Sequence, residues 1–367
     1  MPNRITTQDI ADALGVSRNT VSKAINNSGI LSEATRQRVL EKAREMGYRQ
    51  FSWTEPDSRN ANSGLAQAEK KADPQKKKII LLSTCLLNDS HFSSPLLDKF
   101  QSGIRKAGYS ASLMLVSEND IKNRKLPLQF DPEQTAGIIC FEVFDPEYAH
   151  MVCSQDLPVL FVDAPVCLPN NLLPADRLFM DNQFGLGAII QDLMDKGIKK
   201  FGFVGEIKHC QSFLERYLTF KNTLELAGYA VNPEFCITGH HEDPVRRSGS
   251  DYQAYLLEKI EKLDELPEVF VCANDFVALD LISVLNRLGY MVPRDILVTG
   301  FDDSPESSLI SPNLTSVHIH TQIMGYTAVE LILSRIRNPQ LNYRTVYTET
   351  TPIWRESTGD FSAEIQG

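Results

Sequence analysis

The pattern of apolar and polar residues divides the chain into a helical start, a polar stretch and a long alternating region. Apolar residues recur at the spacing of one helix face within 10–14, within 21–25 and within 39–46. These stripes predict three short helices, and about fifty residues of this kind can close a small core. The stripes consist of Ile10, Ala13 and Leu14, then Val21, Ala24 and Ile25, then Val39, Leu40, Ala43 and Met46.

Local signals mark the ends of the first two helices. Thr6 stands three residues before Asp9, which is the spacing of a capping pair, and Ser17 is suited to cap the second helix. Gly15 lies between them, where the chain must turn sharply. A third helix is predicted over 32–46. Two short helices joined by a tight turn, with a third beside them, indicate a helix-turn-helix domain.

The second predicted helix exposes polar and basic side chains. Such side chains hydrogen-bond the edges of bases or hold phosphate groups, so they predict DNA binding through this helix. A helical protein-interaction module is the alternative, and the chemistry of the exposed groups favours DNA over it. The exposed residues are Arg18, Asn19, Ser22, Lys23 and Asn26.

Residues 50–78 have no sustained apolar period, and Pro, Ser, Asn, Ala and Lys dominate them. This composition predicts a linker. The lysine run at 76–78 can touch phosphate, but a solvated charge run before a strand is the more common arrangement. We therefore predict a DNA-binding domain over 1–49, a linker over 50–78, a larger domain over 79–358 and a tail over 359–367.

From residue 79 onward, short apolar runs alternate with helical patterns. This alternation predicts βαβ units and parallel sheets covered on both faces. The pattern runs twice, so we expect two doubly wound lobes with a cleft between them. Strands are predicted at 79–84, 110–116, 137–143, 158–163, 201–205, 269–273 and 296–302, and helices at 95–107, 185–196, 210–227, 275–288 and 324–337.

Polar side chains follow several of these strands, at the carboxyl ends where ligands bind to such sheets. Carboxylates, an amide and a guanidinium suit a ligand rich in hydroxyl groups, because each can bond neighbouring hydroxyls. Each residue alone can instead cap the next helix, and for Asp275 and Asp303 that alternative is at least equal. For the set together we favour a ligand in the cleft. The set is Ser93, Ser94, Asp163, Arg216, Asn274, Asp275, Asp302 and Asp303.

The charge of the chain is uneven. The formal net charge is −10, yet residues 1–50 carry eight basic and five acidic side chains, so this part is +3 and the remainder is −13. A basic head on an acidic body fits one nucleic-acid module joined to a module with a different task.

Seven cysteines are scattered without C-x-x-C pairs, and most lie in apolar runs such as those around Cys140 and Cys272. They predict reduced core thiols in a cytoplasmic protein. The start of the chain is polar and no apolar run is long enough to span a membrane, so neither a secretory signal nor a membrane anchor is expected.

The head resembles that of LacI/GalR-type transcriptional repressors nearly position by position. The shared pieces are GVS, TVS, NN, S-x-x-T-R-x-R-V and GYR. The resemblance implies a dimeric repressor that places Ser17 to Asn26 in the major groove of a pseudo-palindromic operator. It also implies that Arg18, Asn19 and Lys23 read bases, where Arg or Lys suits guanine and Asn suits adenine. Positions of backbone contact or support in the family correspond to Thr6, Ser22, Asn26, Thr35 and Tyr48.

The body, over roughly 79–358, resembles the sugar-binding effector domain of the same family. The matching pieces are TAGIIC, PVLFVD, FMDN, FLERYLTF, VCANDFVAL, ILVTGFDDSP, SPNLTSV and WREST. The effector contacts of the family carry over to Asp163, Arg216, Asn274 and Asp302. The expected fold is a small all-α helix-turn-helix domain joined to an α/β, two-lobed, periplasmic-binding-protein-like domain with two doubly wound parallel sheets.

The sequence departs from the family in the pocket and in the linker. Residues 94–97 read Ser-Pro-Leu-Leu where the family has Asn-Pro-aromatic-aromatic, and Ala164 stands where an Arg usually follows the Asp. An aromatic platform and a charge partner are lost, so the ligand can differ from the common hexoses. We name Phe220 and Phe276 as candidates for stacking instead.

In the linker, Gln50-Phe51 replaces Pro-Asn, and Glu55-Pro56-Asp57 stands where the family has a short hinge helix. That helix inserts a Leu into the minor groove. A later stretch at 61–66 contains a Gly, which leaves the role of Leu65 as such a wedge open.

Catalytic signatures are absent from the sequence: it has no Walker loop, G-x-S-x-G or H-E-x-x-H. His318 and His320 would face the same side of a strand, but no further ligand stands at a suitable spacing. We therefore expect no catalytic residue, no metal and no cofactor.

These observations predict a cytoplasmic transcriptional regulator, a repressor, that associates with the nucleoid when bound to its operator. Its operator affinity would be controlled by a small carbohydrate-like effector in the cleft between the lobes. The tail after Arg355 has no leucine heptad, so a homodimer is expected. One alternative is a regulator of the same fold that responds to a protein partner or a non-sugar ligand. Another is a transport or chemoreception binding protein, which would need a secretory signal.

Overall fold

The structure is a computed structural model, and it describes residues 6–25, 33–46, 78–84, 93–166, 172–239 and 249–359. The chain divides into two compact units, Met1–Glu69 and Lys70–Gly367. We call the described residues of the first unit the head and those of the second unit the body, and we treat each by itself. The finer domain boundaries given above stay predictions.

Three helices form the head: α1 (Thr7–Leu14), α2 (Arg18–Ile25) and α3 (Glu33–Glu45). Thr6 and Asp9 form a capping box, in which the Asp9 carboxylate accepts from the Thr6 N–H at 2.7 Å. Gly15 ends α1 with a φ of 65°, a conformation that glycine adopts without strain. The Ser17 hydroxyl accepts from the Thr20 N–H at 3.0 Å at the start of α2. The predicted capping pair, turn and second cap are confirmed.

The three helices of the head close a small apolar core. Ile10, Val21 and Val39 are buried in it, as the stripes predict. Ala13 is exposed, and Ala11 is buried in its place, so the stripe assigned to α1 is wrong at this position. The reason is that α1 packs against both α2 and α3, which requires a wider apolar face than one stripe provides.

The first sheet of the body belongs to what we call lobe 1. Its strands are β1 (Lys78–Ser83), β2 (Ser110–Leu115), β3 (Thr135–Phe141), β4 (Val159–Val162), β5 (Asp176–Met180) and β11 (Thr345–Thr348). They pair in parallel in the order β11-β5-β4-β3-β1-β2. The continuous apolar runs of β1, β3 and β4 fit this arrangement, because a parallel sheet is covered on both faces.

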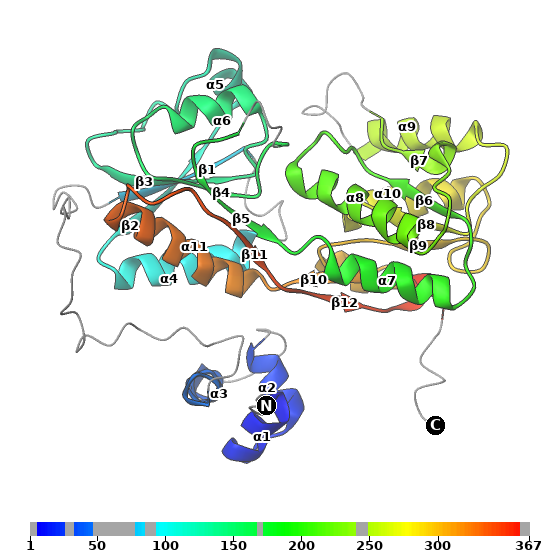
Figure 1. The fold of residues 1–367 in the computed structure, drawn as a ribbon, viewed down its shortest axis with the longest axis horizontal. Coiled ribbons are helices and arrows are strands. Elements are labelled where there is room, and N and C mark those ends of the chain that lie inside the picture. The colour runs from blue at the N-terminus through cyan, green and yellow to red at the C-terminus, as the bar shows by residue number, and fades with distance from the viewer. Residues whose placement is uncertain are drawn as a thin grey trace. The chain divides into compact units, whose positions relative to one another are not determined.

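Helices lie on both faces of this sheet (Figure 1). They are α4 (Ser93–Lys106), α5 (Glu118–Asn123), α6 (Pro146–Cys153) and α11 (Thr321–Arg337). Ile79 of β1 joins the apolar cluster of α4 and α11, whereas Ile80 joins that of α6. Gly325 lets α11 approach α4 closely, since an added Cβ would lie 2.7 Å from the Leu96 carbonyl oxygen.

The second sheet belongs to lobe 2, and its strands pair in parallel in the order β7-β6-β8-β9. The strands are β6 (Phe201–Val204), β7 (Cys236–Ile237), β8 (Val269–Cys272) and β9 (Leu297–Thr299). The helices of this lobe are α7 (Phe184–Asp195), α8 (Gln211–Leu226), α9 (Gly249–Glu261), α10 (Asp275–Arg287) and the short 3₁₀ turns Pro233–Phe235, Pro305–Ser308 and Glu356–Thr358.

The chain passes between the lobes at three connections, which are β5 to α7, β10 to α11 and β11 to β12. The strands β10 (Ser316–Ile319) and β12 (Thr350–Ile353) pair antiparallel as a separate ribbon. The pattern of strands and helices predicted two lobes that follow one another along the chain. That prediction is incomplete, because α11 and β11, which come late in the chain, belong to lobe 1. Apolar periodicity reports that a face is buried, but not which sheet buries it.

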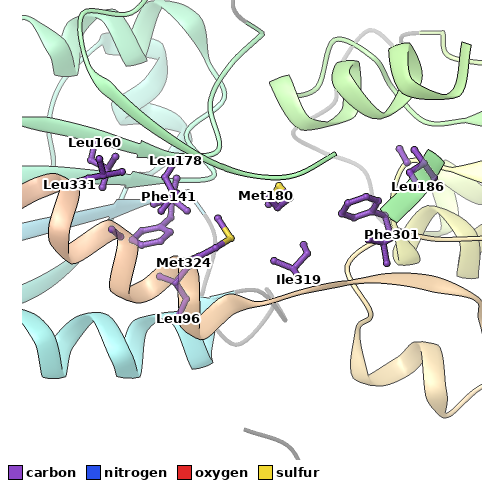
Figure 2. Close-up of a cluster of buried hydrophobic side chains, with 14 of the residues drawn as sticks. Leu96, Phe141, Leu160, Leu178, Met180, Leu186, Phe301, Ile319, Met324 and Leu331 are labelled. Carbon is purple, nitrogen blue, oxygen red and sulfur yellow. The ribbon is translucent and has the colours of Figure 1, made fainter. Parts of the chain in front are cut away.

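One buried apolar cluster runs through both lobes (Figure 2). Leu178 belongs to the sheet of lobe 1, whereas Leu186 and Phe301 belong to lobe 2. Met180 at the end of β5 and Ile319 at the end of β10 lie between them, where the chain changes lobe. The segments that connect the lobes are thus packed into the core. This packing holds in place the strand ends that carry the polar residues. Within the described helices, none combines the length and the apolar character that crossing a membrane requires.

Candidate functional site

In the head, α2 separates its buried side chains from its polar ones. Val21 and Ala24 are buried, whereas Arg18 and Asn19 are exposed at the start of the helix. The Arg18 Nε donates to the Thr7 hydroxyl at 3.3 Å, which directs the side chain along the outer side of the head. This amphipathic arrangement leaves two of the predicted base-reading side chains, Arg18 and Asn19, accessible at the start of α2, whereas the third, Lys23, is half-buried.

The other predicted DNA-binding residues fall into three groups. Thr6 and Ser17 cap α1 and α2, as described above. Ser22 and Lys23 on α2 and Thr35 on α3 are half-buried. Asn26 and Tyr48 lie outside the described residues, so their assignment stays a prediction.

In the body, Asp163 and Asp302 leave their strands with an unusual backbone. Asp163 follows β4 with a φ of 57°, and Asp302 follows β9 with a φ of 106°. Positive φ is uncommon for residues other than glycine, and it clusters at functional sites where the surroundings enforce it. Here the Asp163 N–H donates to the Leu178 carbonyl at 3.0 Å and the Asp302 N–H to the Val317 carbonyl at 3.0 Å.

Arg216 of α8 lies at the centre of the polar group in the body, and its exposed fraction is only 2%. Its Nε donates to the Asn182 Oδ1 at 2.9 Å, and its Nη1 donates to the Ala273 carbonyl at 2.7 Å. The same Nη1 lies 3.3 Å from Asp302 Oδ1. The guanidinium Cζ lies 3.6 Å from the centre of the Phe301 ring. Hydrogen bonds and a ring face therefore fix the plane of the guanidinium.

The two carboxyl groups beside Arg216 resist ionisation. Burial raises the pKa of Asp163 to about 6, although hydrogen bonds and the charge of Arg216 oppose this. Burial likewise raises the pKa of Asp302 to about 6, where Arg216 opposes the change and the charges of Glu142 and Asp163 add to it. The buried Asp163 and the half-buried Asp302 thus place two acceptors with raised pKa values beside one guanidinium, as is common at functional sites.

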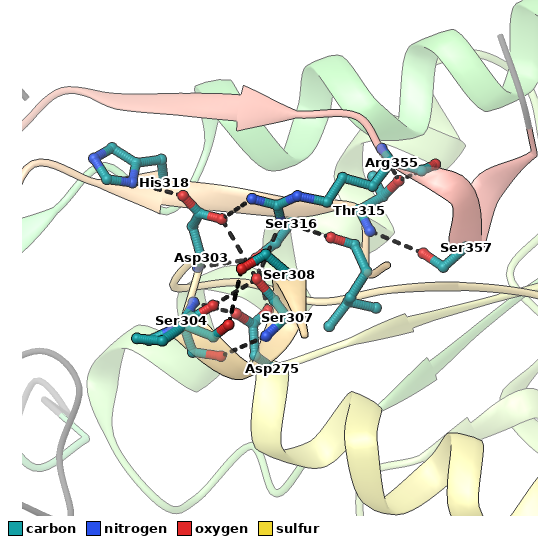
Figure 3. A network of polar contacts seen from close by, with 12 residues as sticks. Asp275, Asp303, Ser304, Ser307, Ser308, Thr315, Ser316, His318, Arg355 and Ser357 are labelled. Carbon is teal, nitrogen blue, oxygen red and sulfur yellow. Dashed lines mark hydrogen bonds and ion pairs between the residues drawn. The ribbon is translucent and has the colours of Figure 1, made fainter. Parts of the chain in front are cut away.

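A second polar network surrounds Asp303, the residue that follows Asp302 in the chain (Figure 3). Asp303 also has a positive φ, 53°, and its carboxylate accepts from His318 at 2.8 Å and from Arg355. The Asp275 carboxylate accepts from the Ser316 hydroxyl and from a backbone N–H, both at 2.6 Å. His318 and Ser316 belong to β10, so the ribbon between the lobes holds the turn that presents Asp302. Asp275 and Asp303 are therefore cross-links between segments, not caps of the next helix.

The other residues predicted to contact the effector differ in their surroundings. The Asn274 side chain accepts from the Val277 N–H at 3.0 Å and caps α10, although the neighbouring Ala273 carbonyl contacts Arg216. Phe276 is 42% exposed at the start of α10. Phe220 is fully buried, with its ring centre 5.5 Å from that of Phe203 in the core, so its assignment to ligand stacking is wrong. Ser93 begins α4, and its side chain is outside the described residues.

The structure adds residues that the sequence did not single out. Asn182 is fully buried beside Arg216, and the Cys210 thiol and Ser212 hydroxyl hydrogen-bond the Asp163 carboxylate. Asn182 stands in the FMDN motif at a strand end, a signal that was available, whereas Cys210 at the start of a predicted helix gave none. Leu97, at the position of the missing aromatic platform, is buried in the core.

The two strand histidines contact each other, with ring centres 4.9 Å apart. His318 pairs with Asp303, and His320 Nε2 lies 2.9 Å from the Thr351 hydroxyl. Burial lowers the pKa of His320 to about 4. Across the described ranges, no three His, Cys, Asp or Glu side chains are grouped closely enough to hold a metal ion.

Two protein families match parts of the chain. The family described as bacterial regulatory proteins, lacI family, matches residues 6–50, and that described as periplasmic binding protein-like domain matches residues 190–358. The first match covers the head and the second covers most of lobe 2 and the chain's return to lobe 1.

Curated relatives match along nearly the whole chain. The transcriptional repressor PurR of Histophilus somni (strain 129Pt) is 28% identical over 335 residues, which is 90% of this chain and 92% of the relative. The transcriptional repressor MelR of Bacillus subtilis (strain 168) is 28% identical over 366 residues, 98% of each chain. These relatives are named as transcriptional regulators, not as enzymes.

Solved structures agree in fold. A transcriptional regulator CelR–cellobiose complex superposes with a TM-score of 0.65 at 21% identity, covering 96% of this chain and all of the other. The lac repressor dimer bound to operator and an anti-inducer superposes with a TM-score of 0.61 at 19% identity, covering 97% of this chain and all of the other.

Proposed function

We propose that this chain, which belongs to the lacI family and is a DNA-binding transcriptional repressor, changes its operator affinity when a small carbohydrate-like effector binds at Asp163, Arg216 and Asp302. In this account it acts in the cytoplasm as a homodimer on a pseudo-palindromic operator, as members of the family act as dimers on operator DNA. The start of α2 reads bases, and the body senses the effector.

The observation that carries the effector assignment is the group around Arg216. Asp163 comes from lobe 1, whereas Arg216 and Asp302 come from lobe 2. Carboxylate oxygens accept hydrogen bonds from hydroxyl groups, and a guanidinium donates to them, often to two neighbouring oxygens at once. A ligand with several adjacent hydroxyls satisfies all three side chains, and by bridging the lobes it favours one relative position of the lobes over others.

The charge balance of the site favours a neutral effector. Glu142 and Asp163 both act on Asp302 through their negative charge, and Arg216 is the cation among them. An anionic ligand such as a sugar phosphate would add negative charge to buried carboxylates, which costs free energy in a poorly solvated site. Neutral sugars avoid this cost, and their hydroxyls provide the donors that the carboxylates require.

Several similar proteins bind sugars or are named after one, which supports the same class of ligand. One structural neighbour is a complex with cellobiose, and another, 20% identical with a TM-score of 0.59, is a complex with D-xylulofuranose. A curated relative from Haemophilus influenzae, 26% identical over 96% of this chain, is named ribose operon repressor. These names support a sugar but do not select one.

A thermal-shift panel tests the proposal. We expect at least one of cellobiose, D-xylulose and D-ribose to raise the melting temperature of the wild type, because a ligand that binds only the folded state stabilises it. D-Ribose 5-phosphate should give no shift. Asp302→Asn should lose the shift, whereas Asp195→Asn, a matched change on the surface of α7, should keep it. If no neutral sugar stabilises the wild type, the sugar proposal is wrong.

A second candidate is a regulator of the same fold that responds to a protein partner or a non-sugar ligand. The burial of Leu96 and Leu97 favours it, because the position where the family has an aromatic platform contributes to the core instead. An unresponsive sugar panel together with operator binding that changes in cell extract would support this candidate.

A further inference from the structure

The side chain of Asn182 connects Arg216 to a third acidic residue that has no place in the effector site described above. Asn182 follows β5 at one of the connections between the lobes, and it is fully buried. Its Oδ1 accepts from Arg216 Nε at 2.9 Å, while its Nδ2 donates to Glu215 Oε2 at 2.8 Å. Asn182 therefore uses both ends of its amide, one towards the guanidinium and one towards a carboxylate.

The polarity of these bonds matters, because an amide can present either its oxygen or its NH₂ group. Arg216 can only donate, so it requires the Asn182 oxygen. The Glu215 carboxylate can only accept when ionised, so it requires the Asn182 NH₂ group. The carboxylate thus selects the one amide orientation that suits Arg216, although Glu215 itself does not pair with Arg216.

Glu215 is in turn held from a different lobe. Its Oε1 accepts from the Tyr347 hydroxyl at 2.9 Å and from Gln211 Nε2 at 2.9 Å. Tyr347 belongs to β11, the edge strand of the lobe 1 sheet, and its ring stacks on Phe179 of β5 with centres 5.4 Å apart. Glu215 belongs to α8 of lobe 2. The Tyr347 to Glu215 bond is therefore a contact between the lobes.

We propose that Glu215 is the positioning residue of Arg216, that it acts through Asn182, and that Tyr347 makes this positioning depend on how lobe 1 meets lobe 2. The relay Tyr347–Glu215–Asn182–Arg216 ends at the ion pair with Asp302. When the lobes move apart, Glu215 loses the Tyr347 hydroxyl, and the restraint on the Asn182 amide weakens. The orientation of the effector-binding guanidinium then depends on how the two lobes are arranged. A repressor needs such a dependence if effector binding and operator binding are to influence each other.

The functional meaning of this relay rests on the proposed effector role of Arg216, but its test requires no effector. The full-length protein is labelled with ¹⁵N at arginine, and exchange of the Arg216 Nε–H with solvent is followed by NMR. In the wild type this proton is buried and hydrogen-bonded, so it exchanges slowly. Circular dichroism melting of each variant reports on the fold separately.

Glu215→Gln is the main variant. The glutamine side chain can turn its NH₂ group towards Asn182. The Asn182 amide then turns its oxygen towards the glutamine and its NH₂ group towards Arg216. Two donors, the Asn182 NH₂ group and the Arg216 Nε–H, then face each other. We expect exchange of the Arg216 Nε–H to become at least tenfold faster. Glu225→Gln is the matched control, because it is the same change on the same helix at an exposed pair with Lys221. It should leave the exchange rate within twofold of the wild type.

A compensating double variant separates positioning from general damage. In Asn182→Asp combined with Glu215→Gln, the aspartate accepts from Arg216 and from the glutamine NH₂ group, and the glutamine oxygen accepts from Tyr347. Slow exchange should return in the double variant, while Asn182→Asp alone, which sets two carboxylates against each other, should exchange fast. A double variant as fast as the single ones would refute the polarity argument.

Tyr347→Phe keeps the ring and removes only the hydroxyl, so it tests the contact between lobes even if the buried variants do not fold. We expect exchange about threefold faster, since two of the three donors to Glu215 remain. Tyr290→Phe, at a half-exposed tyrosine after α10, is its control. Unchanged exchange in Glu215→Gln overturns the role of Glu215, and unchanged exchange in Tyr347→Phe overturns the link to lobe 1. Neither result bears on whether a sugar binds.

Discussion

Asp163 and Asp302 reach Arg216 because each leaves its strand with a positive φ, which turns the chain abruptly at the strand end. Aspartate tolerates this conformation better than most residues. Asp163, Arg216 and Asp302 were expected together from the sequence, since each stands in a motif at or after a strand end. Their mutual contacts and the raised pKa values of the two aspartates could not be expected from the sequence, because they depend on burial and on which strands become neighbours.

The errors at the residue scale have the same origin. Phe220 was named as a stacking candidate in place of the missing aromatic platform, yet its ring is fully buried beside Phe203 in the core. Asn182 stands in the quoted FMDN motif, but it was not singled out, and only the fold brings its side chain against Arg216.

A pH prediction follows from the pKa of Asp163, which burial raises from the usual 3.8 to about 6. The folded state then binds the proton more tightly than the unfolded chain does. The stability that this contributes is complete below about pH 4 and is lost as the pH rises through 6. At pH 7.5, Asp163→Asn should therefore be more stable than the wild type by about 3 kcal/mol, and the difference should vanish near pH 4. Urea unfolding at several pH values measures it.

Asp195→Asn serves as the control, because its carboxylate is on the surface of α7 and accepts from the neighbouring Gln191. It should give a small difference that does not change with pH. A constant gap between the wild type and Asp163→Asn across this pH range would show that burial does not penalise the Asp163 charge.

At the scale of elements, the elements predicted from apolar runs agree with those found, including β1, β3, β4, β6 and β8 and the helices α4, α7, α8 and α10. The short strands β5, β11 and β12 were not predicted because their sequences mix polar and apolar residues, and β7 was not predicted because it has only two residues. The position of β11 in particular depends on a contact that no periodicity encodes. It pairs with β5, and a buried ionic cluster lies at the start of that pair.

That cluster predicts a large stability effect. Asp176 is fully buried at the start of β5, where its carboxylate accepts from Arg335 of α11 at 2.8 Å and from Arg344 at 2.9 Å. Burial acts to raise the pKa of Asp176, but the hydrogen bonds from the two arginines outweigh it, so the pKa lies below its usual value. Asp176→Asn should destabilise the body by about 3 kcal/mol, because it leaves buried guanidinium charge without its partner.

The surface pair of Asp192 with Lys196 provides the comparison, since Asp192→Asn removes an exposed ion pair worth less than about 1 kcal/mol. Both free energies come from the same urea titrations of the full chain. Equal small effects would mean that the Asp176 cluster does not tie β5, α11 and the segment before β11 together.

At the scale of the whole molecule, the account joins two units with separate tasks. The head has the exposed α2 side chains that DNA reading requires, and the body has a polar group shared between two lobes. Residues 50–77, which depart from the family's hinge sequence, lie outside the described residues. If effector and operator are coupled as proposed, linkage requires the coupling to be reciprocal whatever its direction.

The most direct test of the central claim is fluorescence anisotropy with a labelled duplex that the wild type selects from a random pool. Operator affinity is measured with and without cellobiose, D-xylulose or D-ribose, for the wild type and for Arg216→Ala. We predict that one sugar changes the wild-type Kd at least tenfold, which corresponds to a coupling of about 1.4 kcal/mol. Arg216→Ala should bind the duplex with unchanged affinity and show no response. An Arg216→Ala variant that responds like the wild type would contradict the account.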